Sequence, residues 1–294
     1  ENLGKKANIV IDYESLEEKT KGVVEMLRSN PDYKGLMLTI SEALEKANKN
    51  TLLISVDNHK DSLAISRSVL DKVKNKVIID HHRRSEEFIS SPVLTYLEPS
   101  ASSTVELLVE LFDYQQHEIE ISSLDATIMY TGMLVDTNYF RQHVGTRTFQ
   151  SAAKLKEAQA DLSLAYELLE DSFECMKEIF DITESAYRYK DKFLIATGKD
   201  EELSRSTLAK AANQLVYVSG IYAAFAIGYI SKNTVAISAR SSKKVNVQMI
   251  MENDALHGGG HFSMAACQIE NVTIEEAKER LEHAIDAYLE DRGV

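Results

Sequence analysis

The sequence predicts an α/β protein with two lobes, a parallel-sheet domain followed by a smaller α/β domain. In the first half, short β-branched runs alternate with longer helical patterns, which is typical of a mostly parallel sheet covered by helices. The 294 residues, 44% of them hydrophobic, suffice for two cores. A helical stretch without Pro or Gly lies between the two patterns. We therefore expect a first domain over residues 1–147, a helical linker over 148–187 and a second domain over 188–294.

The strands expected in the first domain bring carboxylates to one edge of the sheet. Hydrophobic periodicity predicts strands at 7–12, 51–57 and 76–80, and helices at 16–28, 104–114 and 123–135. The second and third strands end at Asp57 and Asp80. Ligands of parallel sheets gather beyond the carboxyl ends of the strands, so both side chains should emerge at a ligand site. The helix over 123–135 would deliver Asp136 to its end.

The second domain shows a similar mixture on a smaller scale. The sequence pattern predicts strands at 193–196, 220–230 and 234–238, and helices at 203–215 and 274–289. A smaller α/β lobe should therefore close the chain.

Composition restricts the partners. The 33 Lys and Arg residues against 46 Asp and Glu residues give a net charge of −13, so no general basic surface is available for long nucleic acid. Cys175 and Cys267 are far apart, which indicates neither a disulfide framework nor a zinc ribbon. No apolar run of about 18 residues and no signal-peptide layout occurs, so we expect a cytoplasmic polypeptide.

A cluster of acids and imidazoles predicts a metal site. Asp80, His81 and His82 follow directly from an expected strand, and Asp57 and Asp136 each end another apolar segment. Carboxylate oxygens and neutral imidazoles are the ligands that Mg²⁺ and Mn²⁺ accept. Each acid alone would be read as a helix cap or a loop residue. Together with the histidine pair, the set favours a divalent metal site.

A second set of residues in the C-terminal lobe suits an anionic ligand. A glycine run, Gly258 to Gly260, would let backbone N–H groups approach phosphate closely, and it is followed by His261. Arg240 offers a guanidinium that matches phosphate geometry, and Ser241 follows it. The alternative interpretation of the glycines is a plain turn.

The roles of several nearby side chains stay open. Lys243 and Lys244 either extend a basic patch or belong to a solvated face, and Arg83 and Arg84 either meet phosphate or pair with neighbouring glutamates. We interpret two further histidines near the motifs, His59 and His143, as structural.

These residues resemble the signature motifs of the DHH phosphoesterase family. Asp57, the Asp80-His81-His82 triplet and Asp136 are similar to its second, third and fourth motifs, in order. The string Gly258-Gly259-Gly260-His261, followed by Ala265-Ala266, resembles the GGGH-x-x-A-A signature of the DHH-associated C-terminal domain. Within the family, the strings at 80–84 and 98–104 resemble most closely the cyclic di-AMP phosphodiesterases of the GdpP type.

The resemblance implies roles for individual residues. Asp57 would bridge two Mn²⁺ ions, with Mg²⁺ as the alternative, while His81 and Asp136 would complete the site of one ion. Asp80 would support the cluster, and His82 would face substrate phosphate. The residues implied to hold nucleotide phosphates in the other lobe are His261, the amides of Gly258, Gly259 and Gly260, Arg240 and Ser241.

The implied activity is hydrolysis of cyclic di-AMP to linear pApA by a metal-activated hydroxide. A nanoRNase or phosphoadenosine phosphatase acting on short linear substrates, and a family II pyrophosphatase, are alternatives. The resemblance further implies a homodimer that forms the cytoplasmic part of a membrane-anchored bacterial protein. A role as a structural or oligomerisation module, with the helical region as an interface, is the plainest alternative.

The sequence also departs from the family pattern. The first motif, H-x-x-x-D-x-D, supplies three further ligands in the family, and no such string precedes the expected strand at 7–12. This departure favours a further alternative, a nucleotide-binding module without turnover. His257 stands where the family usually has another glycine, which affects the loop and not the assignment.

Overall fold

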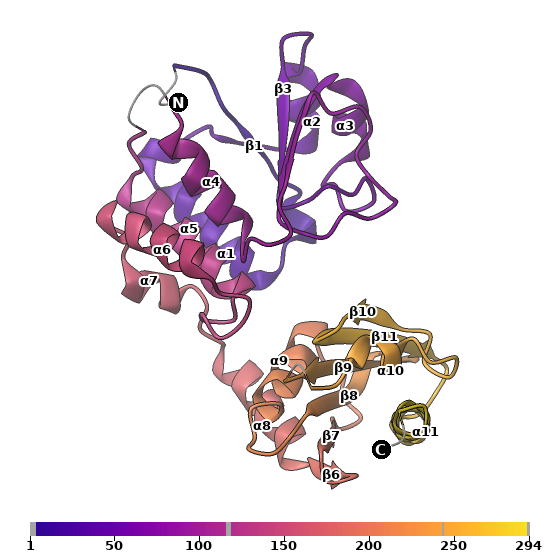
Figure 1. Ribbon diagram of the computed structural model, residues 1–294. Helices are drawn as coiled ribbons and strands as arrows, with labels where there is room; N and C mark the ends of the chain where they lie inside the picture. The colour runs from indigo at the N-terminus through magenta and orange to yellow at the C-terminus, as the bar shows by residue number, and fades with distance from the viewer. Residues whose placement is uncertain (1–3, 116–118, 243, 293–294) are drawn as a thin grey trace. The chain divides into compact units, whose positions relative to one another are not determined.

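The computed structural model describes residues 4–115, 119–242 and 244–292, and it is drawn in Figure 1. The chain divides into two compact units, residues 1–170 and 171–294.

The first unit contains parallel sheets, as predicted. Strand β1 (Ile9–Val10) pairs with β2 (Met37–Leu38), and a separate three-stranded sheet has the order β3-β4-β5. The strands of that sheet are all parallel, and they are β3 (Leu52–Val56), β4 (Asn75–Asp80) and β5 (Leu94–Leu97). The strand expected at 7–12 is shorter than predicted because its pairing with β2 covers only two positions.

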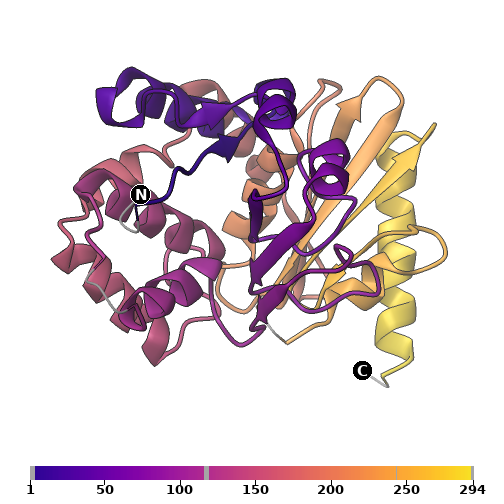
Figure 2. The ribbon, with the colours of Figure 1, turned by 90° about the horizontal axis from the view of Figure 1, so that it is seen from above.

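Helices surround these strands in two groups. In Figures 1 and 2, helices α4 to α7 gather into one layer, and α2 and α3 lie together beside the three-stranded sheet. Ser103 accepts a hydrogen bond from the Val105 amide and so caps α4, as its position predicts. The helices of the unit are α1 (Glu18–Ser29), α2 (Ile40–Lys46), α3 (Arg67–Lys72), α4 (Thr104–Asp113), α5 (Ser123–Asp136), α6 (Thr146–Glu157) and α7 (Leu162–Glu167), with 3₁₀ turns η1 (Tyr13–Ser15) and η2 (Pro31–Tyr33).

The helical layer has its own core. Met133 and Leu134 of α5 are completely buried, and they pack in one cluster with Leu155 of α6 and Ala165 of α7. This packing fixes α5, and so it fixes the position of Asp136 at the end of that helix.

The second unit is built on one mixed sheet with the order β10-β11-β9-β8-β7-β6. Neighbouring strands are antiparallel, except for β7 and β8, which run parallel. The strands are β6 (Tyr187–Tyr189), β7 (Phe193–Thr197), β8 (Ala223–Ser231), β9 (Thr234–Ser241), β10 (Gly259–His261) and β11 (Met264–Glu270). The structure thus confirms the smaller α/β lobe.

Each face of this sheet packs against helices. One core joins Phe225 and Ile237 to α10 (Val247–Met251) and α11 (Ile274–Glu290). The other joins Ala226 to α8 (Phe173–Glu184) and α9 (Arg205–Leu215). Figure 1 shows the two helix pairs on opposite sides of the strands.

The stretch predicted as a linker is largely helical. It contains α6, α7 and α8, and the division between the two units falls inside it, between Glu170 and Asp171. Among the described residues we find no helix whose length and hydropathy together would let it traverse a lipid bilayer.

The two cysteines should differ strongly in reactivity. Cys267 of β11 is 5% exposed, and burial raises the pKa of its thiol to about 12, whereas Cys175 of α8 is half-buried. Because the thiolate is the nucleophile, we expect N-ethylmaleimide at pH 7.5 to modify Cys175 and to leave Cys267 unmodified until the unit unfolds. Mass spectrometry of peptides with and without urea measures this, and rapid labelling of Cys267 in the native chain would contradict the packing.

Candidate metal centre and nucleotide groove

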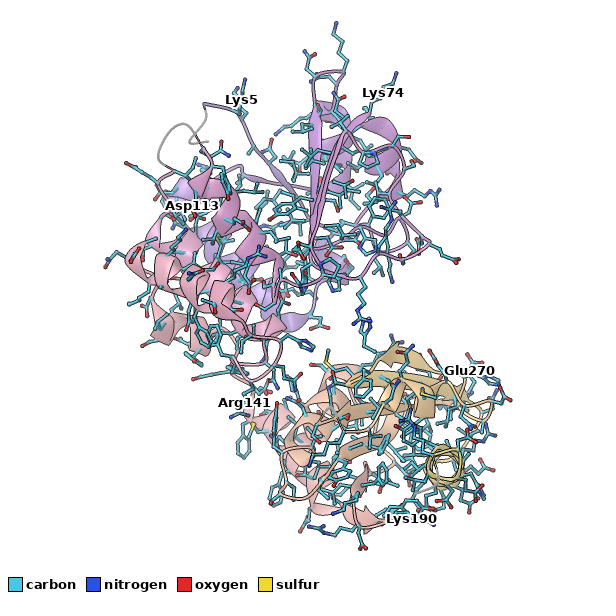
Figure 3. The ribbon with its side chains drawn as sticks, in the orientation of Figure 1. Lys5, Lys74, Asp113, Arg141, Lys190 and Glu270 are labelled. Atoms are coloured by element: carbon cyan, nitrogen blue, oxygen red, sulfur yellow. The ribbon has the colours of Figure 1, made fainter. Side chains whose placement is uncertain are left out.

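The candidate metal centre lies at the carboxyl end of the parallel sheet, as predicted. Asp57, His81 and His82 each offer a ligand atom, and these atoms lie within 4.8 Å of one another. The Nε2 atom of His81 is 3.5 Å from Oδ1 of Asp57, and the Nδ1 atom of His82 is 3.8 Å from the same oxygen. In Figure 3, Lys74 marks the opposite end of β4. The donor set of one carboxylate and two imidazoles fits Mn²⁺ or Mg²⁺.

Asp57 is held in an unusual backbone conformation. It follows β3 directly and has a φ of 62°, in the left-handed region that Asp tolerates better than most residues. Its amide donates to the carbonyl of Ile79, and Thr104, the first residue of α4, donates to its Oδ1 at 2.7 Å. These contacts aim the carboxylate toward the histidines and leave it about half exposed, with 48% of its side-chain surface accessible.

Asp80 acts as a buried support. Its carboxylate is fully buried and accepts hydrogen bonds from the amide of His82 at 3.0 Å and from the ring of His82 at 2.7 Å. Nδ1 of His59 lies 2.5 Å from the other carboxylate oxygen of Asp80, Oδ2. Burial alone would raise the pKa of Asp80, but the hydrogen bonds from His82 and His59 outweigh burial and hold that pKa well below its usual range. The hydrogen bond that the His82 ring donates to Asp80 in turn raises the pKa of His82 above its ordinary value.

Asp136 ends α5 near this cluster but is not part of the close set of ligand atoms found among the described residues. Burial raises the pKa of Asp136, a hydrogen bond with Ser103 opposes that rise, and the charge of Asp57 adds to it. The charge of Asp57 thus disfavours the ionised form of Asp136. Such an arrangement is relieved by a cation between the acids.

The phosphate-binding residues expected in the second unit lie on the interior strand β9 and on or next to the edge strand β10. Arg240, Gly259 and Gly260 line a groove of about 350 Å³. Ser241 is buried and donates to the carbonyl of Val245, and the Gly258 amide donates to the carbonyl of Met251 at 2.7 Å. His261 is exposed on β10. Only part of the expected set therefore faces the groove, and the Gly258 amide already has a partner inside the protein.

Each of the two units matches the sequence model of a known protein family. Residues 5–133 match the model of the DHH family, N-terminal domain, and residues 190–291 match the model of the DHHA1 domain. The chain belongs to the DHH family. The DHH domain carries the cluster of candidate metal ligands, and the DHHA1 domain carries the groove.

Several curated DHH proteins are similar to this chain. It is 42% identical over 280 residues to the cyclic-di-AMP phosphodiesterase PdeA of Listeria monocytogenes, a match that covers 90% of this chain and 42% of that protein. It is 39% identical over 285 residues to the cyclic-di-AMP phosphodiesterase GdpP of Bacillus subtilis, covering 96% of this chain and 43% of that protein. The chain thus spans less than half the length of these relatives.

A solved structure supports the fold. An exopolyphosphatase-related protein from Bacteroides fragilis superposes with a TM-score of 0.75 at 19% identity, covering 96% of this chain and 83% of the other. At that identity the likeness concerns the fold alone.

Some side chains near the DHH motif have roles that the sequence left open. The guanidinium of Arg84 lies over the ring of Phe88 at 4.7 Å, and Glu87 accepts hydrogen bonds from Ser62. Within the described part of the chain, no ion pair joins Arg84 to Glu87. In the DHHA1 domain, Lys244 lies over the ring of Tyr222 at 4.6 Å, and Lys243 lies outside the described residues.

His59 has a more specific role than the sequence indicated. It is 1% exposed, its Nδ1 contacts Asp80, and its Nε2 lies 3.2 Å from the hydroxyl of Ser85. The ring therefore joins the loop after β3 to the loop after β4, behind the candidate metal ligands. Its position two residues after Asp57 was a weak signal for this role, because the contact with Asp80 depends on the path of the loop.

Replacement of His59 by leucine should weaken metal binding without removing a ligand. The loss of a hydrogen-bonding partner behind a metal site typically costs about 10- to 100-fold in metal affinity. It also leaves Asp80 with one partner fewer, so the free energy of unfolding should fall by about 1–3 kcal/mol. Electron paramagnetic resonance of free Mn²⁺ measures the affinity. His283→Leu, on the exposed face of α11, is the control, and an equal affinity in the His59 and His283 variants would contradict the role.

Proposed function

We propose that this chain is the catalytic portion of a metal-dependent phosphodiesterase that hydrolyses cyclic di-AMP to linear pApA. The observation that carries the proposal is the Asp57–His81–His82 cluster, supported by the buried Asp80, in a chain about 40% identical to named cyclic-di-AMP phosphodiesterases. The carboxyl edge of a parallel sheet is the usual place for such chemistry.

Two Mn²⁺ ions, with Mg²⁺ as the alternative, are the proposed cofactors. Asp57, His81 and Asp136 would hold them. When bound, such ions supply Lewis acidity toward phosphate oxygens and a nucleophilic hydroxide at neutral pH. The unfavourable effect of the Asp57 charge on ionised Asp136 supports a cation at this position.

His82 is proposed to face the substrate and not to hold an ion, because the ring nitrogen nearest to Asp57, Nδ1, is already hydrogen-bonded to Asp80 at 2.7 Å. Its Nδ1 is turned to Asp80, so Nε2 is the ring nitrogen that can meet a phosphate oxygen. Its side chain is 49% exposed, and the raised pKa favours the protonated ring, which donates from Nε2. In the DHHA1 domain, Arg240 and the backbone of β10 are proposed to hold a second phosphate, so that only one ester bond is aligned for attack.

A second candidate function is a nucleotide-binding module without turnover. The observation that favours it is the size of the ligand cluster, since the described residues bring only three ligand side chains within reach of one ion. This set is small for a centre of two ions held by protein ligands.

The direct test is product formation from cyclic di-AMP in excess Mn²⁺, followed by chromatography. The control is a variant in which Asp80, His81 and His82 are all replaced by alanine. Appearance of pApA only with the unmutated chain supports the proposal. Turnover of linear pApA without turnover of cyclic di-AMP favours the short-dinucleotide nuclease, and tight binding of cyclic di-AMP without product favours the binding module.

Two further expectations stay predictions. The resemblance implies a homodimer and a membrane-anchored parent protein, and neither follows from the described residues. Sedimentation equilibrium of the purified chain tests the first, and fractionation of cells that express the parent protein tests the second.

A further inference from the structure

The groove in the DHHA1 domain is formed by an uncovered part of the sheet and the side of α9. Ala236 of β9 belongs to the core under α8 and α9, so alternate residues of β9, Ser238 and Arg240, face the same side. Cross-strand pairing continues this face onto the neighbouring strand β11, where the partners of the three residues are Gln268, Ala266 and Met264 in turn.

The middle of the groove is flat and apolar. Gly259, Ala266 and Ser238 form one row across β10, β11 and β9, and none of them has a long side chain. Leu208 and Ala209 of α9 form the wall beside this row. A floor of small residues next to an aliphatic wall fits a planar ring laid against the sheet.

The two ends of the groove are polar and differ in character. At one end, Nη1 of Arg240 donates to the carbonyl of Ala239, and no carboxylate among the described residues forms an ion pair with this guanidinium. At the other end, Nη2 of Arg205 donates to Oε1 of Gln268 at 3.0 Å. Met264, which pairs with Arg240, and Gln268 are separated by four positions on β11, or about 13 Å at about 3.3 Å per residue.

We propose that one nucleotide lies along this groove, with its phosphate at Arg240 and its base edge at Gln268, and that Gln268 selects adenine. Arg205 is a positioning residue, because it acts on the base through Gln268. The proposal rests on the proposed function, which supplies the identity of the substrate. It adds the residue that recognises the base of that substrate. The sequence alone offered no base-reading motif.

The selection follows from the donors and acceptors of the amide. A glutamine amide can accept from the N6 amino group of adenine while it donates to N7. Arg205 holds Oε1 from one side, and an amide oxygen has a second lone pair that remains available for N6. Guanine presents acceptors at both O6 and N7, so one of them would face the amide oxygen.

The test is binding of 5′-AMP and 5′-GMP by calorimetry to the unmutated chain and to Gln268→Glu. Glutamate keeps the size of the side chain and the contact with Arg205, but it cannot donate to N7. A purely structural role for the Arg205–Gln268 pair therefore predicts no change in this variant. The matched control is Gln214→Glu, on an exposed position of the same helix as Arg205.

The unmutated chain should bind 5′-AMP at least about tenfold more tightly than 5′-GMP, because a bidentate contact is worth about 1–3 kcal/mol of discrimination. Gln268→Glu should lose most of that preference, and Gln214→Glu should keep it. Equal binding of the two nucleotides by the unmutated chain, or an unchanged preference in Gln268→Glu, overturns the inference. A preference for 5′-AMP in a chain that hydrolyses no cyclic di-AMP would refute the proposed function and leave this inference standing.

Discussion

Asp57→Asn is expected to abolish hydrolysis of cyclic di-AMP while the DHH domain stays folded. Asparagine keeps the size of the side chain, tolerates the φ of 62°, and can still accept the hydrogen bond from Thr104. It removes the charge of the one carboxylate in the ligand cluster. Loss of a partner behind a metal ligand costs about 10- to 100-fold, so loss of a proposed ligand itself should exceed about 100-fold in kcat/KM.

The control for this variant is Asp61→Asn, four positions further along the chain. Asp61 forms a surface ion pair with Arg67 at 3.0 Å, and such pairs contribute about 0–1 kcal/mol to stability. Activity should therefore persist in the control. Thermal unfolding followed by circular dichroism checks that both variants are folded. A folded Asp57→Asn chain with undiminished turnover would remove Asp57 from the metal centre and the proposed mechanism with it.

The positions of the candidate-site residues in the DHH domain were largely predictable, because these residues stand at the ends of apolar segments. Strand β4 ends at Asp80 and helix α5 ends at Asp136, so periodicity alone located both acids. Parallel pairing of β3 with β4 then brought Asp57 and His81 together. A single sequence carries these signals because they depend on local pattern and on a general property of parallel sheets.

The supporting contacts were not predictable for a physical reason. His59 reaches Asp80 only through the loop between β3 and α3, whose path is set by side-chain hydrogen bonds and not by periodicity. In the DHHA1 domain, Arg205 and Gln268 are 63 positions apart in the sequence. They meet because α9 packs beside the uncovered part of the sheet. Such contacts arise from tertiary packing, which overrides local preference.

The glycine run shows that identical residues can have different functions. A Cβ at Gly260 would lie 2.5 Å from both Cα of Ala265 and the carbonyl oxygen of Met264, and Gly260 has a φ of 150°. A Cβ at Gly258 would lie 2.5 Å from the carbonyl oxygen of Ala266. At Gly259 the Cβ would meet nothing within 4 Å, yet this residue lines the groove. The sequence pattern does not distinguish the three glycines, but the space around each of them differs in the fold.

Gly260→Ala should therefore destabilise the DHHA1 domain strongly. The strained φ and the clash with the backbone of β11 should together lower its free energy of unfolding by about 2–4 kcal/mol. Because the chain has no tryptophan, urea unfolding is best followed by circular dichroism, with hydrogen exchange of peptides from β9 to β11 as the local measurement. Protection in those peptides should fall in Gly260→Ala. Unchanged protection would mean that the β10–β11 hairpin can rearrange freely around a side chain.

Gly259→Ala is the matched variant, and it should separate stability from binding. With open space around the added methyl group, the change in unfolding free energy should stay within about 0.5 kcal/mol. The methyl group would, however, project toward the floor of the groove, where the proposed nucleotide would lie against the backbone of β10. We therefore expect normal hydrogen exchange but weaker binding of 5′-AMP. Normal binding in this variant would show that the nucleotide does not rest on Gly259, and it would leave Arg240 as the phosphate contact.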